Sequence, residues 1–62
     1  MKHRYQITRK MLKPGFEFNH LGMIYRVLRF NHKRDVVKVE NPLTGFQGEY
    51  NYKLIRLHSR LI

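Results

Sequence analysis

The residues with the clearest chemical meaning in this sequence are its lysines and arginines, of which there are 13 against four Asp and Glu. The resulting formal charge of +9 over 62 residues opposes compaction of the chain through self-repulsion. An anionic partner relieves that repulsion, and Lys and Arg are the side chains that contact nucleic-acid phosphates. This balance favours a nucleic-acid-binding protein. The alternatives are a module that binds an acidic protein surface, and a basic surface that serves solubility alone.

The cations fall into groups along the chain that could each reach phosphate. They are an N-terminal set (Lys2, Arg4, Arg9, Lys10), an outward pair on two expected strands (Arg26, Lys38), a loop set (Lys33, Arg34) and a C-terminal set (Lys53, Arg56, Arg60). Arg29 joins the outward pair only if its strand bends near Leu28, because strict alternation turns it inward. We expect contact with the phosphate backbone, of DNA rather than RNA, with little base reading.

Aromatic rings are the second feature that could bind nucleic acid, since unpaired bases stack on exposed rings. Most of the eight aromatic residues must fill the core of so small a protein. Phe30, Tyr50 and Tyr52 are the candidates for a stacking or docking surface. The reason is that Phe46 and Tyr25 are expected to supply the inward rings of their strands.

The sequence gives little evidence for catalysis or metal binding. A chain this small offers no enclosed setting in which two carboxylates would differ in pKa. Ser59 follows His58, but adjacent residues on a strand point to opposite faces, so the two form no dyad. The histidines have no metal-ligand spacing, cysteine is absent, and we expect each histidine in a loop or at the surface. They are His3, His20, His32 and His58. We predict a non-enzymatic protein without cofactor or metal.

The segment Met23–Asn41 positions many of these cations. Two runs rich in β-branched and aromatic residues flank the charged connector His32–Asp35, which is typical of a β-hairpin. Val27 and Val39 then face inward on the two strands, because side chains alternate along a strand.

Turn residues recur on both sides of this hairpin, as in all-β chains. The expected turns are Lys13–Gly15, Asn19–Gly22 and Asn41–Gly45, and the expected further strands are Phe16–Phe18 and Phe46–Tyr52. Gly48, inside the second of these strands, indicates a bulge or a close crossing.

Two segments allow more than one interpretation. Alternation favours a strand over Arg4–Thr8, whose edge could pair with a partner or a second copy; the alternative is a basic arm within residues 1–13. Lys53–Ile62 fits both a helical stripe and a strand. We expect a single helical turn around Leu54–Leu57 that leads into a closing strand.

Five or six short strands in 62 residues are too few for an ordinary two-layer sandwich. We therefore expect one all-β domain over residues 1–62, a small, partly open barrel that hides its sheet edges. The rhythm of turn glycines and alternating apolar residues resembles that of SH3-like small barrels. It is carried by Pro14–Phe18, Gly22–Val27, Val36–Asn41, Thr44-Gly45 and Tyr50–Leu54.

Among these barrels the chain resembles most the basic barrel of Mu-type transposases and retroviral-type integrases, and also Tudor-like and KOW-like modules. The resemblance implies sequence-independent DNA contact. The chain departs from those enzymes because it has no catalytic core and adds a basic N-terminal segment. Fold alone does not give function, so an accessory role has to be argued separately.

The remaining expectations concern the cellular location and origin of the protein, and an alternative function. The absence of cysteine fits a reducing compartment, and no apolar run predicts a membrane span. We expect a cytoplasmic or nucleoid-associated product of a bacterium, phage or mobile element. The alternative function is a small regulator or inhibitor that docks on an acidic face of a larger nucleic-acid-processing protein.

Overall fold

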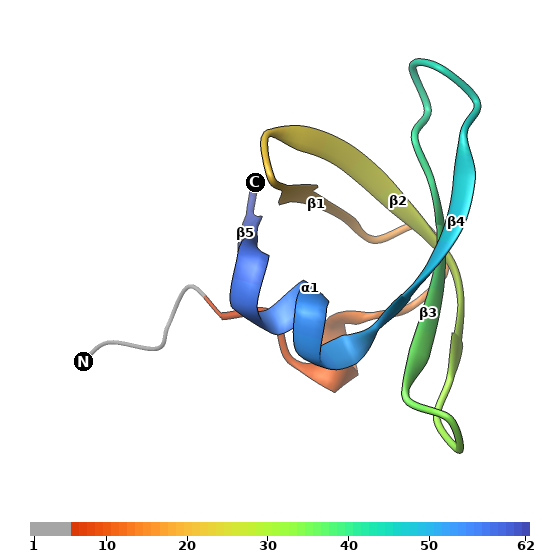
Figure 1. The fold of residues 1–62 in the computed structure, drawn as a ribbon, viewed down its shortest axis with the longest axis vertical. Coiled ribbons are helices and arrows are strands. Elements are labelled where there is room, and N and C mark those ends of the chain that lie inside the picture. Colours follow the sequence, from red (N-terminus) through yellow and green to blue (C-terminus); the bar gives the residue numbers. More distant parts are fainter. Residues whose placement is uncertain (1–5) are drawn as a thin grey trace.

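A computed structural model describes residues 6–62 as one antiparallel five-stranded sheet with a short helix near the C-terminus (Figure 1). The elements in chain order are η1 (Arg9–Met11), β1 (Glu17–His20), β2 (Met23–Asn31), β3 (Val36–Glu40), β4 (Gln47–Asn51), α1 (Tyr52–His58) and β5 (Ser59–Leu61). The strand order is β4-β3-β2-β1-β5, so β4 and β5 form the two edges of an open sheet. The expectation of a mostly β chain is confirmed.

The β2–β3 hairpin forms where the sequence predicts it. Val27 pairs with Val39, and both side chains are buried. The connecting loop is held by the side chain of Asn31, whose Oδ1 accepts the backbone N–H groups of Lys33 at 3.0 Å and Arg34 at 3.1 Å. This is the local bonding by which Asn stabilises turns.

A β-bulge in β2 decides which side chains reach its outer face. Val27 pairs with Val39 and Arg29 with Lys38, so Leu28 is an extra residue without a partner on β3. The extra residue restores Arg29 to the outer face, as expected for a strand that bends at this point. It also turns Phe30 inward against the core, so the expectation of an outward Phe30 is wrong.

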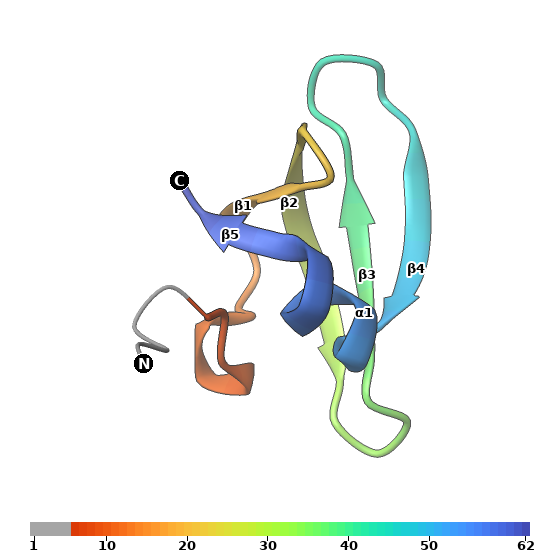
Figure 2. The same cartoon turned by 60° about the vertical axis from the view of Figure 1, so that its left-hand side comes forward.

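The core lies between the inner face of the curled sheet and the segments that contain η1 and α1 (Figures 1 and 2). Its buried residues are Ile7, Leu12, Phe18, Tyr25, Val27, Val37, Val39, Tyr52 and Ile55. Alternate residues of β2 and β3 supply four of these nine residues, because the inward side chains of a strand recur every second position.

The N-terminal segment packs under the sheet instead of joining it. Gln6–Thr8 is not a strand, and it leads into the 3-10 turn η1; the other two residues of the expected strand lie outside the described part. Ile7 is fully buried, and its carbonyl accepts the hydroxyl of Tyr52 at 2.8 Å. Burial of Ile7 under α1 therefore replaces the expected strand pairing.

Replacement of Tyr52 by phenylalanine tests this anchor. The change leaves the ring in place and removes the hydroxyl that donates to the buried carbonyl of Ile7. An unsatisfied buried acceptor costs about 1–3 kcal/mol, so we expect the free energy of unfolding in urea to fall by about that amount. Tyr50→Phe, at a half-buried tyrosine that does not bind this segment, is the comparison. An equal loss in both variants would contradict the assignment.

The strand expected at Phe46–Tyr52 is shorter at both ends. Asn51 ends β4 and caps α1, since its Oδ1 accepts the backbone N–H of Lys53 at 2.9 Å. Tyr52 therefore begins the helix and turns into the core, where it is 6% exposed. Tyr52 is therefore excluded as a candidate for an exposed stacking ring.

Gly48 does not mark a bulge, because β3 and β4 pair without interruption from Val36–Asn51 to Glu40–Gln47. The ring of Phe46 covers it instead. A Cβ atom on Gly48 would lie 3.0 Å from Cε2 of Phe46. Phe46 itself is 53% exposed, so it does not supply the inward ring expected of it.

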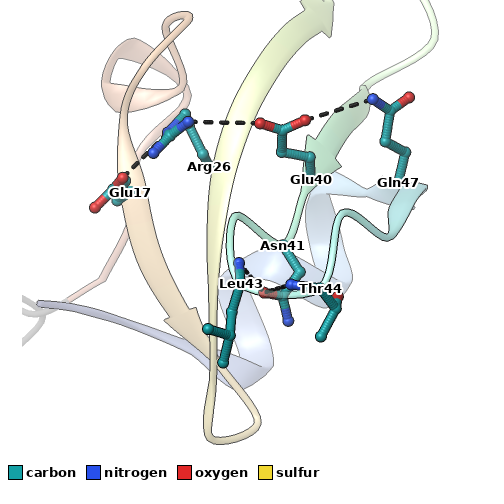
Figure 3. Close-up of polar contacts among 7 residues, drawn as sticks. All are labelled: Glu17, Arg26, Glu40, Asn41, Leu43, Thr44 and Gln47. Carbon is teal, nitrogen blue, oxygen red and sulfur yellow. Dashed lines mark hydrogen bonds and ion pairs between the residues drawn. The ribbon is translucent and has the colours of Figure 1, made fainter.

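The remaining turns and the C-terminal segment match expectation in part. The turn expected at Asn19–Gly22 is shorter, because Asn19 and His20 belong to β1, and the C-terminal helix is longer than the expected single turn. The β3–β4 loop is closed by the buried Asn41, whose Oδ1 accepts the N–H groups of Leu43 at 2.9 Å and Thr44 at 3.3 Å (Figure 3). Tyr52–His58 forms the short helix α1, and Ser59–Leu61 forms β5, which pairs with β1. Among residues 6–62, no helix is both long and apolar enough to cross a membrane.

Candidate nucleic-acid interface

The outer face of the sheet carries two rows of charged residues that run across its strands. The first row is Glu17, Arg26, Glu40 and Gln47, each paired in register with the next (Figure 3). Arg26 Nε lies 3.1 Å from Glu17 Oε2, and its Nη1 lies 3.5 Å from Glu40 Oε2. Gln47 Nε2 donates to Glu40 Oε1 at 3.4 Å. Two carboxylates thus share one guanidinium, which leaves Arg26 with little charge to offer phosphate.

In the second row, positive charges outnumber negative ones. Arg29 on β2 lies directly opposite Lys38 on β3, and Lys38 lies opposite Glu49 on β4. Like charges that face each other across two strands destabilise the sheet. No ion pair involving these three residues is found within the described part of the chain. The row therefore keeps an excess of positive charge.

Arg34 adds a third cation at the same place. Together with Arg29, Lys38 and Glu49 it lines a hollow of about 190 Å³ at the loop end of the β2–β3 hairpin. The Leu28 bulge brings Arg29 to this hollow. The turn held by Asn31 brings Arg34 to it. We call this the hairpin hollow.

Asp35 follows Arg34 in sequence but is engaged elsewhere. Its two carboxylate oxygens accept Nε and Nη2 of Arg9 at 2.9 and 2.8 Å, and the Arg9 guanidinium lies 4.3 Å from the ring centre of Tyr52. The hydrogen bond from Arg9 holds the pKa of Asp35 below its usual value. Asp35 therefore remains ionised in its pair with Arg9, which occupies both side chains.

The remaining cations lie on other elements. Lys53 and Arg56 on α1 line a second hollow of about 360 Å³ with Gln6 and Leu57. Lys10 is exposed on η1, and Arg60 lies on β5. The other two members of the N-terminal set, Lys2 and Arg4, lie outside the described residues.

The cations are unevenly distributed along the molecule. The β2–β3 loop, η1 and the start of α1 lie toward one end of its long axis, and the β3–β4 loop and β1–β2 turn lie toward the other (Figure 1). Neither residues 19–25 nor residues 41–47 include a lysine or arginine. We call the end with the β2–β3 loop the basic end, and the opposite one the apolar end.

The aromatic candidates do not form an exposed platform beside these cations. Tyr52 is buried, and Phe30 packs against it with ring centres 6.3 Å apart. Tyr50 is half-buried and lies 5.1 Å from the His20 ring and 5.9 Å from the Tyr25 ring. All three rings lie mainly in the interior of the protein. The Leu28 bulge and the Asn51 cap are the local features that turn Phe30 and Tyr52 inward.

A buried contact between His20 and Ser59 was missed by sequence reasoning. The two are cross-strand partners on β1 and β5, and Nδ1 of His20 lies 2.6 Å from Oγ of Ser59. Both side chains are buried, so the expectation of a surface His20 is wrong. Burial, and then the nearby His58, lower the pKa of His20. Only the β1–β5 register, which the sequence does not show, joins these residues.

His20 is expected to make stability depend on pH. The unfolded chain regains the ordinary histidine pKa near 6.5 and binds a proton that the folded chain resists. The free energy of unfolding should therefore fall as the pH drops below 6.5, and level off below the folded-state pKa. The groups that face His20 are Ser59, His58, Tyr25 and Tyr50.

Urea denaturation at pH values from about 7.5 down to about 4.5, which span the ordinary histidine pKa, measures this effect. His20→Gln should flatten the slope, and His32→Gln, at an exposed loop position, is the matched control. An unchanged slope in His20→Gln would contradict the assignment.

Within residues 6–62, no group of three or more His, Asp or Glu side chains is placed to hold a metal ion. Comparison of the chain with protein-family models, with curated proteins and with solved structures finds no match.

Proposed function

We propose that this protein is a non-catalytic module that binds the phosphate backbone of nucleic acid through its basic end. The observation that carries the proposal is the hairpin hollow, where Arg29, Lys38 and Arg34 surround one space and two of them repel each other across the strands. A phosphate in this hollow would remove that repulsion and accept hydrogen bonds from all three side chains.

The pairing of the acids supports the same site. Glu17 and Glu40 are engaged by Arg26, and Asp35 is engaged by Arg9. Glu49 is the fourth acid and the only one that lines the hollow. Three cations against one carboxylate leave the hollow with a net positive charge. Lys53 and Arg56 line a separate hollow on α1, which adds positive charge for a polyanion that extends beyond the hairpin hollow.

Duplex DNA is the partner that this geometry favours. Recognition of single strands and of RNA loops relies on exposed rings for base stacking. Phe30, Tyr50 and Tyr52 face the interior, and the exposed Phe46 does not line the hairpin hollow. Contacts to phosphate need only cations, and they carry no sequence information directly. The proposed binding is therefore to the backbone and varies little with sequence.

The proposal also covers the fold family and the cellular location of the protein. The strand order, the curl of the sheet over its core and the position of α1 between β4 and β5 support an SH3-like small barrel of the kind found in Mu-type transposases and retroviral-type integrases. In that reading the protein is an accessory factor of a phage or mobile element. It would act in the cytoplasm or on the nucleoid.

A salt titration tests the proposed function. We expect the affinity for a duplex of about 20 base pairs to fall about 100-fold between about 50 and 200 mM salt, as for about four phosphate contacts. Fluorescence anisotropy of labelled duplexes measures it, and duplexes of the same composition in shuffled order should bind equally. An affinity that does not change with salt would contradict phosphate binding.

A further inference from the structure

The apolar end of the molecule carries a second surface that phosphate binding does not use. A groove of about 460 Å³ runs between the β1–β2 turn and the last residues of the chain. Its lining includes Leu21, Ile24, Leu61 and Ile62. Leu21 and Ile62 are 70% and 74% exposed, and Ile24 is 37% exposed. Clustered large apolar side chains at a surface are typical of interaction sites.

Leu21 occupies a position that its residue type disfavours. It has a φ of 53° and is followed by Gly22 with a φ of 86°. Two successive positive φ values are typical of the hairpin turn for which Asn-Gly is preferred, because a branched side chain crowds the left-handed conformation. A leucine that is 70% exposed gains little for the fold here. A side chain that breaks a local rule and stays mostly in solvent is best explained by a function of the exposed side chain itself.

The groove also carries positive charge. Arg60 is among its lining residues, and none of the four acids is. Arg60 lies on β5, the last strand in the sheet order within the described residues. Edge strands of this kind add an extended peptide through backbone hydrogen bonds. A cationic, apolar groove beside such an edge complements a peptide with apolar and acidic residues.

We propose that this groove binds an extended segment of a partner protein in which apolar side chains are flanked by carboxylates. The apolar side chains contact Leu21, Ile24 and Ile62, and a carboxylate pairs with Arg60. A second copy of the chain fits less well, because each copy carries a net charge of +9 and would repel the other. The site is separate from the basic end, so one molecule could hold nucleic acid and a protein together.

The first test uses the full ¹⁵N-labelled chain and two synthetic peptides. The acidic probe is Asp-Asp-Leu-Ile-Val-Leu-Asp-Asp, blocked at both ends, and its counterpart has lysine in place of each aspartate. We expect the acidic probe to shift the amide signals of residues 19–24 and 58–62, with the lysine peptide at least about tenfold weaker. Equal binding of both peptides, or shifts confined to the basic end, would overturn the proposal.

The second test uses a matched pair of variants. Leu21→Asn removes the apolar side chain and suits the left-handed backbone, so the fold should be kept and the affinity for the acidic probe should fall about tenfold. Leu57→Gln changes a leucine that is 73% exposed on α1 and should leave this affinity unchanged. Equal affinity in Leu21→Asn and the unchanged protein would overturn the proposal.

Two further readouts separate the outcomes. Sedimentation of the protein alone should show a monomer, and a dimer that Leu21→Asn dissociates would show that a second copy is the occupant, against the proposal. Leu21→Asn should keep the affinity for duplex DNA. Loss of DNA binding in that variant would mean that the groove belongs to the nucleic-acid site, which would also overturn a separate peptide site.

Discussion

Replacement of Arg29 and Lys38 together by glutamine is expected to weaken binding of duplex DNA about 30-fold at low salt. The same change should lower the slope of log affinity against log salt by about two, because two phosphate contacts no longer release counterions. The reason is structural: Arg29 and Lys38 are cross-strand neighbours that line one hollow. Anisotropy titrations at several salt concentrations give both quantities.

The chain offers a control with the same change in charge and residue type. Lys13→Gln with Arg60→Gln also removes one lysine and one arginine, from exposed positions outside the hairpin hollow. We expect this control to lose less than about threefold in affinity. Equal losses in the two double variants would mean that total charge, and not the hollow, determines binding.

At this site, a substitution that weakens DNA binding should raise the stability of the fold. Arg29→Gln alone removes the repulsion across β2 and β3 and leaves Lys38 opposite Glu49. The free energy of unfolding should then rise by a few tenths of a kcal/mol, up to about 1 kcal/mol. Urea denaturation measures it. A clear loss of stability would show that Arg29 serves the fold and would weaken its assignment to phosphate.

Replacement of Phe18 by alanine is expected to unfold much of the protein at room temperature. Phe18 is fully buried, and its ring lies within 6.4 Å, centre to centre, of those of Phe16, His20 and Tyr25. Loss of a buried phenylalanine costs about 3–5 kcal/mol. Stabilities of about 0.05–0.15 kcal/mol per residue give a chain of this size only about 3–9 kcal/mol in total. Near-ultraviolet circular dichroism and urea denaturation would report the loss.

Phe46→Ala is the matched control for that variant. Phe46 is 53% exposed and covers Gly48 at the edge strand β4. We expect a loss of about 1 kcal/mol or less, because most of the ring is already in water. A loss as large as that in Phe18→Ala would show that Phe46 belongs to the core, as the alternation of its strand suggests.

The hairpin could be predicted from the sequence because its evidence is local. Alternation of Tyr25, Val27, Val37 and Val39 sets both the strands and their inner face. The charged connector sets the loop. The C-terminal helical turn and closing strand were also predictable, since both patterns are present in the same ten residues.

The parts that were mispredicted depend on one residue or on distant partners. One extra residue at Leu28 reverses the facing of Phe30, and one capping residue, Asn51, moves Tyr52 from a strand into a helix. The packing of Ile7 under α1 joins positions 45 residues apart, which no local pattern encodes.

The sequence identifies the cations of the site but not their arrangement in space. Every cation is visible in the sequence, yet Arg26 and Arg9 are engaged by carboxylates that only the strand register and the loop bring near them. Arg29 was predicted conditionally, and the bulge supplies that condition. The pairing of the acids, which decides where positive charge remains, follows from tertiary structure alone.

The most direct test of phosphate binding at the basic end is a titration of the ¹⁵N-labelled chain with a short DNA duplex at low salt. We predict that the amide signals of residues 29–38 and of the start of α1 shift together in proportion to bound DNA. The signals of residues 19–25 and 41–47 should stay in place. Shifts that spread evenly over the whole chain, or that centre on those two uncharged segments, would contradict binding through the hairpin hollow.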